Sequence, residues 1–353
     1  MTDISLEPKN ETIEPLGRRL TRWVSEQRVW MVSATILVAL AIFSPTQSWE
    51  SASFATVNLL DVSPYLLLSI VIAAYAGATG ADGLIARAFT GSPYAMILIA
   101  AIAGGLSPFC SCGVIPLIAA LLAMGVPLSA VMAFWLASPI MDPSMFVLTT
   151  GVIGYEFAVA KTVTAIALGL YGGITVHMLA GAGGLQDPLR DGVGNGGCGG
   201  SKVREVKPVV WRFWEDSARV EKGRKEVVKT TLFLAKWLVL AFILESLMLA
   251  YLPADLVSQA VGGEGIQPIA IATLVGVPAY LNGYAALPLV GGLIEQGMAP
   301  GAGLAFLVAG GVTSLPAAIA VWALVKKHVF ALYIALALSG SLVSGILFQL
   351  WVG

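Results

Sequence analysis

Two cysteines stand one residue apart inside a long apolar stretch of the chain. Cys110 and Cys112 belong to the run PFCSCG at residues 108–113. On a regular helix, residues i and i+2 point about 200° apart, so both thiols can face one site only if this segment is unwound. Pro108 and Gly113 favour such an unwound turn. A helix that begins near Gly113 would direct the positive end of its dipole at the thiols, which favours the thiolate, a soft ligand for thiophilic centres.

The two thiols also have a second interpretation, because a free cysteine packs as a small hydrophobe. A later apolar stretch resembles this one, and aligning the two places Asn282 opposite Cys110 and Tyr284 opposite Cys112. If the two segments meet, soft sulfur faces a neutral amide and a phenol, which suits a small, largely uncharged substrate with a soft centre. A bare divalent cation would need more thiolates or a nearby carboxylate, so no metal site is expected. The expected substrate-binding residues, all in these two segments, are Pro108, Cys110, Ser111, Cys112, Gly113, Tyr280, Asn282 and Tyr284.

Four ionisable side chains lie inside apolar stretches, where a charge at the bilayer centre costs roughly 2.5 to 3.5 kcal/mol. Asp142 belongs to the proline-flanked run SPIMDP, and Glu245 lies deep within a later stretch. Both carboxylates are candidates for proton coupling, although Asp142 could instead satisfy backbone groups that the prolines leave free. Lys161 and Lys236 are expected to extend toward the membrane surface.

The composition defines the class of protein that carries these residues. The chain has 353 residues, of which 57% are hydrophobic and only 12% charged, and its mean hydropathy is +0.84. Soluble domains carry about 25% charged residues, so a soluble enzyme is excluded. The net charge of −1 indicates no nucleic-acid partner, and three cysteines are too few for a disulfide framework. The sequence therefore predicts an all-α polytopic membrane protein whose partners are the lipid bilayer and a small-molecule substrate.

Apolar stretches of spanning length recur along the chain. A spanning helix needs about 20 mostly apolar residues. Seven continuous spans are expected at 29–44, 62–80, 128–150, 156–180, 230–251, 301–325 and 329–351. Two further stretches, 94–125 and 266–297, are too long for one crossing and are interrupted by SPFCSCG and PAYLNGY. Each is predicted to be a re-entrant hairpin of two half-helices whose tip lines a site.

Charge placement predicts the orientation. Lysine and arginine cluster in residues 1–28, 190–229 and 326–327. Because positive loops face the cytoplasm, these three segments are expected inside, with the N-terminus cytoplasmic and the C-terminus periplasmic. Three segments without lysine or arginine are expected outside: 45–61, 151–156 and 252–265. Seven crossings and two same-side hairpins satisfy all of these assignments.

An internal duplication is predicted when the sequence is aligned with itself at a constant shift of 172 residues. This shift, which we call the repeat offset, superimposes Gly104 on Gly276 and Pro116 on Pro288 without a gap. Each unit then holds three spanning helices and one re-entrant broken hairpin, and the odd number of crossings makes the two units inverted repeats, an architecture of secondary transporters. The expected divisions are a cytoplasmic segment (1–28), an extra N-terminal helix with an outer loop (29–58), repeat 1 (59–180), a cytoplasmic linker with an amphipathic helix (181–229) and repeat 2 (230–353).

Two runs of the sequence resemble a known family. They are PFCSCGVIPLIAALLAMGVPLSAVMAFWLASPIMDP and YLNGYAALPLVGGLIEQGM, and they are similar to the ArsP/YraQ-like permeases. The resemblance implies a permease of the bacterial inner membrane. For the ArsP branch it implies efflux of trivalent organoarsenicals such as methylarsenite, hence arsenic resistance, with Cys110 and Cys112 in the substrate region.

The expected function is proton-coupled export of a small thiophilic solute between the two hairpins. Two alternatives remain open at this stage: a permease of the same fold for another sulfur- or metal-containing solute, and an intramembrane thiol-disulfide relay through Cys110 and Cys112. A relay would place one thiol in each repeat, whereas both lie in the first. No phosphate-loop motif occurs in the chain, so ATP hydrolysis is not expected. As a permease, the protein is expected to be no enzyme and to use no cofactor. The sequence leaves the oligomeric state open.

Overall fold

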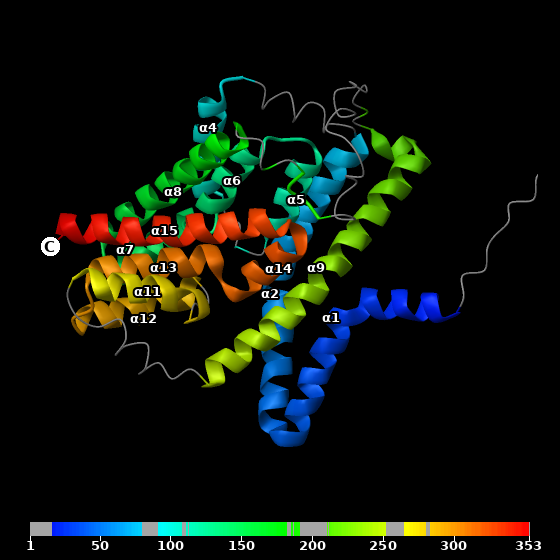
Figure 1. The fold of residues 1–353 in the computed structure, drawn as a ribbon, viewed down its shortest axis with the longest axis horizontal. Coiled ribbons are helices and arrows are strands. Elements are labelled where there is room, and N and C mark those ends of the chain that lie inside the picture. Colours follow the sequence, from blue (N-terminus) through cyan, green and yellow to red (C-terminus); the bar gives the residue numbers. More distant parts are fainter. Residues whose placement is uncertain are drawn as a thin grey trace, which may run out of the picture.

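The computed structural model of the chain is built from helices (Figure 1). It describes residues 16–79, 91–107, 111, 113–181, 185, 187–190, 210, 212–251, 265–279 and 283–352. In this part of the chain the α-helices are α1 (Leu16–Phe43), α2 (Pro45–Thr79), α4 (Pro93–Gly105), α5 (Ile115–Ala123), α6 (Leu128–Ala137), α7 (Pro143–Val152), α8 (Tyr155–Gly181), α9 (Ser217–Tyr251), α11 (Ile266–Ala279), α12 (Gly283–Glu295), α13 (Pro300–Thr313), α14 (Leu315–Leu324) and α15 (Lys327–Val352). The predicted all-α class is confirmed.

Four stretches of described helix are long and apolar enough to cross a membrane. They are Tyr155–Gly181, Arg219–Leu247, Pro300–Leu324 and Lys327–Val352. Shorter apolar helices of 10–17 residues make up much of the rest, as expected where a stretch is broken within the membrane. The two stretches predicted to be hairpins are each divided into two short helices, α4 with α5 and α11 with α12.

The helices recur along the chain at the offset found in the sequence. The repeat offset carries the first and last residues of α2 onto the first and last residues of α9, and it carries both ends of α7 onto both ends of α14. It also carries the first residue of α8 onto the first residue of α15. The second unit therefore repeats the helix order of the first, and it starts at α9, inside the segment predicted to be a linker. Helix α1 lies outside the repeat.

Packing contacts recur as well. A Cβ atom added to Gly104 of α4 would lie 2.6 Å from the carbonyl oxygen of Phe134 in α6. A Cβ atom added to Gly276 of α11 would lie 2.7 Å from the carbonyl oxygen of Phe306 in α13. The repeat offset relates the two glycines and also the two phenylalanines, so the same close helix crossing is built twice. Small residues permit this approach, which gains packing energy between helices in a membrane.

This crossing gives a testable prediction about stability. Replacing Gly276 by alanine should destabilise the protein by about 1 to 3 kcal/mol, because the new methyl group meets backbone that cannot move aside. Gly292 in α12 is the matched control, since a Cβ atom there meets nothing within 4 Å. Thermal unfolding of both detergent-purified variants measures the difference. Equal melting temperatures for Gly276→Ala and the wild type would contradict the close crossing.

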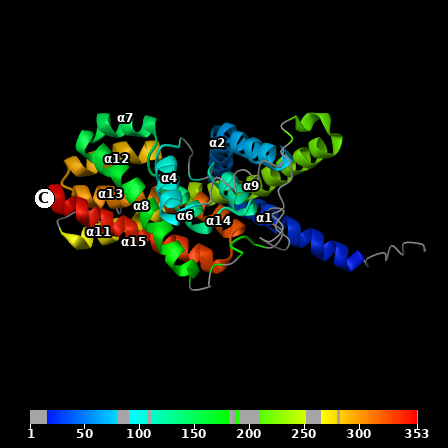
Figure 2. The same ribbon diagram turned by 90° about the horizontal axis from the view of Figure 1, so that it is seen from above.

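Helices α2 and α9 pair in antiparallel fashion. Ser246 near the end of α9 donates to Ser51 near the start of α2, with an Oγ–Oγ distance of 3.0 Å. At the other end, Arg219 donates to the carbonyl oxygen of Ala78 over 2.9 Å. Figure 1 shows this pair toward one end of the molecule and helices α11 to α13 toward the other, and Figure 2 shows the same separation from above.

Two expected loops or linkers are helical instead. Residues 45–61, predicted to be an outer loop, form the first part of α2 and continue into the predicted span. Residues 217–229, predicted to belong to a separate amphipathic helix, continue directly into the span of α9. The pairing of α2 with α9 explains both differences, because each helix extension packs against the other end of its partner and gains the burial that periodicity alone does not reveal.

Two predicted spans are broken in the middle. The expected span 128–150 consists of α6 and α7, separated at 138–142, and the expected span 301–325 consists of α13 and α14, separated at Ser314. Prolines explain both breaks. Pro143 occupies the first turn of α7 and Pro316 the first turn of α14, positions where a missing amide proton costs nothing but the preceding turn cannot continue.

Candidate functional site

Most of the predicted binding residues lie outside the described part of the chain. These are Pro108, Cys110, Cys112, Tyr280 and Asn282, and the side chain of Tyr284 is outside it as well. The structure does place Ser111 and Gly113 of the first hairpin, together with Asp142 and Glu245. The site is therefore built from the residues that bracket the two cysteines in the chain and from the elements that contact them.

Two serines anchor the first hairpin tip to two different units. Ser107, just after α4, shares a hydrogen bond with Ser138 at the break between α6 and α7, with an Oγ–Oγ distance of 2.7 Å. Ser111 shares one with Ser314 at the break between α13 and α14, over 3.2 Å. The first hairpin tip thus contacts the broken helix of its own unit through Ser107 and that of the other unit through Ser111. All four hydroxyls can donate or accept, which lets these contacts exchange partners.

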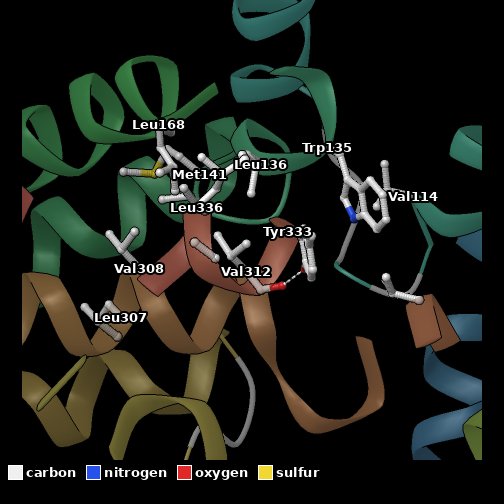
Figure 3. Close-up of a cluster of buried hydrophobic side chains, with 14 of the residues drawn as sticks. Val114, Trp135, Leu136, Met141, Leu168, Leu307, Val308, Val312, Tyr333 and Leu336 are labelled. Carbon is white, nitrogen blue, oxygen red and sulfur yellow. Dashed lines mark hydrogen bonds between the residues drawn. The ribbon is translucent and has the colours of Figure 1, made fainter. Parts of the chain in front are cut away.

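The break in the second unit is held by an aromatic pair. In a continuous helix the carbonyl of Val312 would accept from the amide of residue 316, but that residue is Pro316 and has no amide proton. The hydroxyl of Tyr333 in α15 donates to this carbonyl instead (Figure 3). Trp135 of α6 stacks on the tyrosine ring with centroids 4.6 Å apart. Both rings are fully buried, so the orphaned carbonyl is satisfied in the interior.

The break in the first unit is held by a helix cap. Asp142 caps the N-terminus of α7, accepting from the amide of Met145 over 2.8 Å and from the hydroxyl of Ser144. Lys161 of α8 interacts electrostatically with Asp142 and is only 1% exposed. The expectation that Lys161 reaches the membrane surface is therefore wrong. The negative charge of Asp142, which is half-buried, attracts this ammonium group, although no direct ion pair joins the two among the contacts of the described residues.

The two breaks use equivalent positions with different chemistry. The repeat offset carries Lys161 onto Tyr333 and Asp142 onto Ser314. In each unit, a polar side chain in the second turn of the last long helix interacts with the break of the same unit. These side chains are Lys161 in α8 and Tyr333 in α15. Sequence reasoning missed four residues of the site, which are Tyr333, Ser314, Ser107 and Ser138. The offset was a usable signal for Tyr333 and Ser314, because it maps them onto two ionisable residues already singled out.

Glu245 lies on a different part of the molecule. Its side chain is 3% exposed within α9. The adjacent Ser246 contacts Ser51 of α2, which places this stretch of α9 at the α2–α9 pair rather than at the serine contacts of the hairpin tip. The structure thus brings Asp142 to a broken helix of the candidate site, whereas no described contact joins Glu245 to it.

Comparison with known proteins identifies the family of this chain. A family model described as "Predicted permease" (ArsP_1) matches residues 48–350. The chain belongs to this permease family. It is also 33% identical over 101 residues to the UPF0718 protein YcgR of Bacillus subtilis (strain 168), a match covering 29% of this chain and 34% of that protein. No solved structure matches the chain.

Family membership and the helices together define the class of molecule. The family is one of permeases, and the described helices include four of spanning length and composition. The chain is therefore a multi-pass membrane protein of a transporter family. The match begins at residue 48, within α2, so it covers both repeated units and leaves out α1.

Proposed function

We propose that this permease exports a small thiophilic solute, with trivalent organoarsenicals such as methylarsenite as the substrate class. The substrate would bind at the first hairpin tip, with Cys110 and Cys112 as soft ligands. The observation that carries the proposal is the contact between Ser111 and Ser314, where the first tip meets the broken helix of the other unit. A site at such a junction changes shape when one unit moves against the other.

The transport cycle follows from the duplication. We propose that the two units are inverted repeats and that they rock against each other around the site, as in other transporters built from broken helices. The matched helix bounds and the antiparallel pairing of α2 with α9 support this arrangement. Asn282 and Tyr284 would complete the site from the second hairpin, since the repeat offset places them opposite the two cysteines.

The proposed location is the bacterial inner membrane. Lysine and arginine are concentrated in residues 1–28 and 190–229, which would face the cytoplasm, and the C-terminus would be periplasmic. The partners are then the surrounding lipid and the exported solute, and nothing in the charge distribution calls for a nucleic acid.

Coupling to protons would use one of two carboxylates, the half-buried Asp142 or the buried Glu245. Asp142 is the leading candidate because it lies at the break that contacts Ser107 through Ser138, next to the cysteine segment. Glu245 is the second candidate, since a carboxyl group buried in the interior can exist as the neutral acid and load a proton. A proton taken up at either carboxylate on one side and released on the other would drive export.

Transport by everted membrane vesicles tests this proposal. An imposed gradient of one pH unit, acidic inside the vesicle, should raise wild-type accumulation of methylarsenite about tenfold. One pH unit corresponds to a tenfold driving force when one proton exchanges for one substrate molecule. Asp142→Asn should remove this response, and Glu245→Gln is compared beside it, each normalised to the amount of folded protein. A wild type that transports but ignores the gradient would indicate uniport. A wild type that moves no trivalent arsenical would refute the substrate class.

A further inference from the structure

We propose that Tyr333 is a positioning residue of the transport site, which fixes the break between α13 and α14 in the geometry that lets Ser314 contact the first hairpin tip. The proposed function assigns substrate binding to the first hairpin tip. This inference rests on the proposed function only in its transport experiment. The residue acts through Val312 and Ser314 rather than as a ligand of the substrate.

The carbonyl of Val312 has no helical partner at the break between α13 and α14. Pro316 deprives the Val312 carbonyl of its helical partner, and Ser314, between the two, has the extended backbone angles φ −50° and ψ 148°. A buried carbonyl without a donor is unfavourable, so the chain would relax toward another conformation if nothing held it. The hydroxyl of Tyr333 is the donor that the structure provides (Figure 3).

The ring of Tyr333 is immobilised by stacking against Trp135. Trp135 lies nearly parallel to the Tyr333 ring, at 21°, and comes from α6 of the first unit. Neither side chain is exposed. The ring therefore cannot swing away from Val312 without disturbing a helix of the opposite unit. This ties the break in the second unit to the unit that carries the cysteines.

The first unit repeats this arrangement at the equivalent position of α8. Lys161 occupies the position equivalent to Tyr333 and interacts with Asp142, the equivalent of Ser314. One position in the last helix thus supports the broken helix in both units. Lysine does so by charge, and tyrosine by a neutral hydrogen bond. Because this support recurs with different chemistry, we infer that its role is to position the break rather than to contribute a particular functional group.

A cross-linking experiment tests the position of Ser314 without reference to any substrate. Ser111→Cys and Ser314→Cys are introduced together after the three native cysteines are replaced by serine, and disulfide formation is driven by a mild oxidant in native membranes. The 3.2 Å contact between the two hydroxyls predicts efficient cross-linking. Adding Tyr333→Phe should lower the initial rate about fivefold, the change expected when one buried hydrogen bond is lost.

Tyr171→Phe is the matched control. Tyr171 of α8 also bonds through its hydroxyl, to Ser339 over 3.1 Å, but on the exposed surface. This variant should cross-link at the unmodified rate. An equal rate in Tyr333→Phe would overturn the inference, and so would an equal slowing in both variants, since that would reflect a general loosening.

Transport separates this inference from the proposed function. With native cysteines present, Tyr333→Phe should raise the half-saturating concentration of methylarsenite about fivefold and change the maximal rate little. If the wild type fails to transport while the cross-linking difference persists, the substrate proposal fails and the positioning role stands. If the wild type transports and Tyr333→Phe alters neither readout, the positioning role fails alone.

Discussion

Replacing both Cys110 and Cys112 by serine should abolish resistance to methylarsenite in a sensitive bacterial host. Serine keeps the size of the side chain but replaces a soft thiolate by a hard hydroxyl, which is a poor ligand for a thiophilic centre. We expect the tolerated concentration to fall to that of cells without the permease, a change of about tenfold or more if binding loses a few kcal/mol. Growth on graded methylarsenite measures it.

Cys198→Ser is the matched control for this experiment. Cys198 lies in the glycine-rich segment between the two units, away from both hairpins in the sequence, and its replacement should leave resistance unchanged. Membrane levels of each variant are compared by immunoblot. Full resistance in the double variant would reduce the two cysteines to packing residues, and the site would then depend on Asn282, Tyr284 and backbone groups.

The second large effect is expected at Asp142, whose charge acts on the buried Lys161. Asp142→Asn should lower the free energy of unfolding by about 1 to 3 kcal/mol, because it removes the negative charge that attracts the buried ammonium of Lys161. Asparagine is as good an N-cap as aspartate, so the substitution removes the charge and keeps the cap of α7. Thermal unfolding in detergent measures the loss.

A second substitution separates stability from coupling. Lys161→Met in the Asp142→Asn background should restore most of the lost stability, because methionine fills the site without a charge. The restored protein should still ignore a proton gradient if Asp142 carries the proton. Lys236→Met is the control, since Lys236 lies over the Phe233 ring and is not fully buried. Rescue by Lys236→Met, or none by Lys161→Met, would contradict the pairing.

The interruptions of the two apolar stretches and the repeat offset were predictable because both rest on local signals. Proline and glycine at fixed places in an apolar stretch interrupt a helix wherever the chain folds, and the structure divides both stretches as expected. The repeat offset followed from coincident glycines and prolines, and the helix bounds and glycine contacts reproduce it. The two prolines that flank Asp142 had also indicated the break within 128–150. Span 301–325 was predicted as continuous because hydropathy averages over a break as short as Ser314.

The length of α2 and the surroundings of Lys161 were not predictable in the same way. Residues 45–61 contain no long apolar run, and they are helical because α9 packs alongside them. Lys161 lies near one end of its predicted span, so reaching the surface was the simpler expectation, but the folded protein buries it where the charge of Asp142 acts on it.

The sequence by itself therefore determined the membrane class, the breaks in the two long apolar stretches, the repeat offset and the residue types available for chemistry. Each depends on composition or on neighbours within one helical turn or one repeat offset. The tertiary structure alone decided which unit contacts the first hairpin, that Tyr333 satisfies the carbonyl freed by Pro316, and that Lys161 is buried where the charge of Asp142 acts on it. These contacts join residues far apart in the chain, and their partners are selected by packing and by the need to satisfy buried polar groups, which no local pattern encodes.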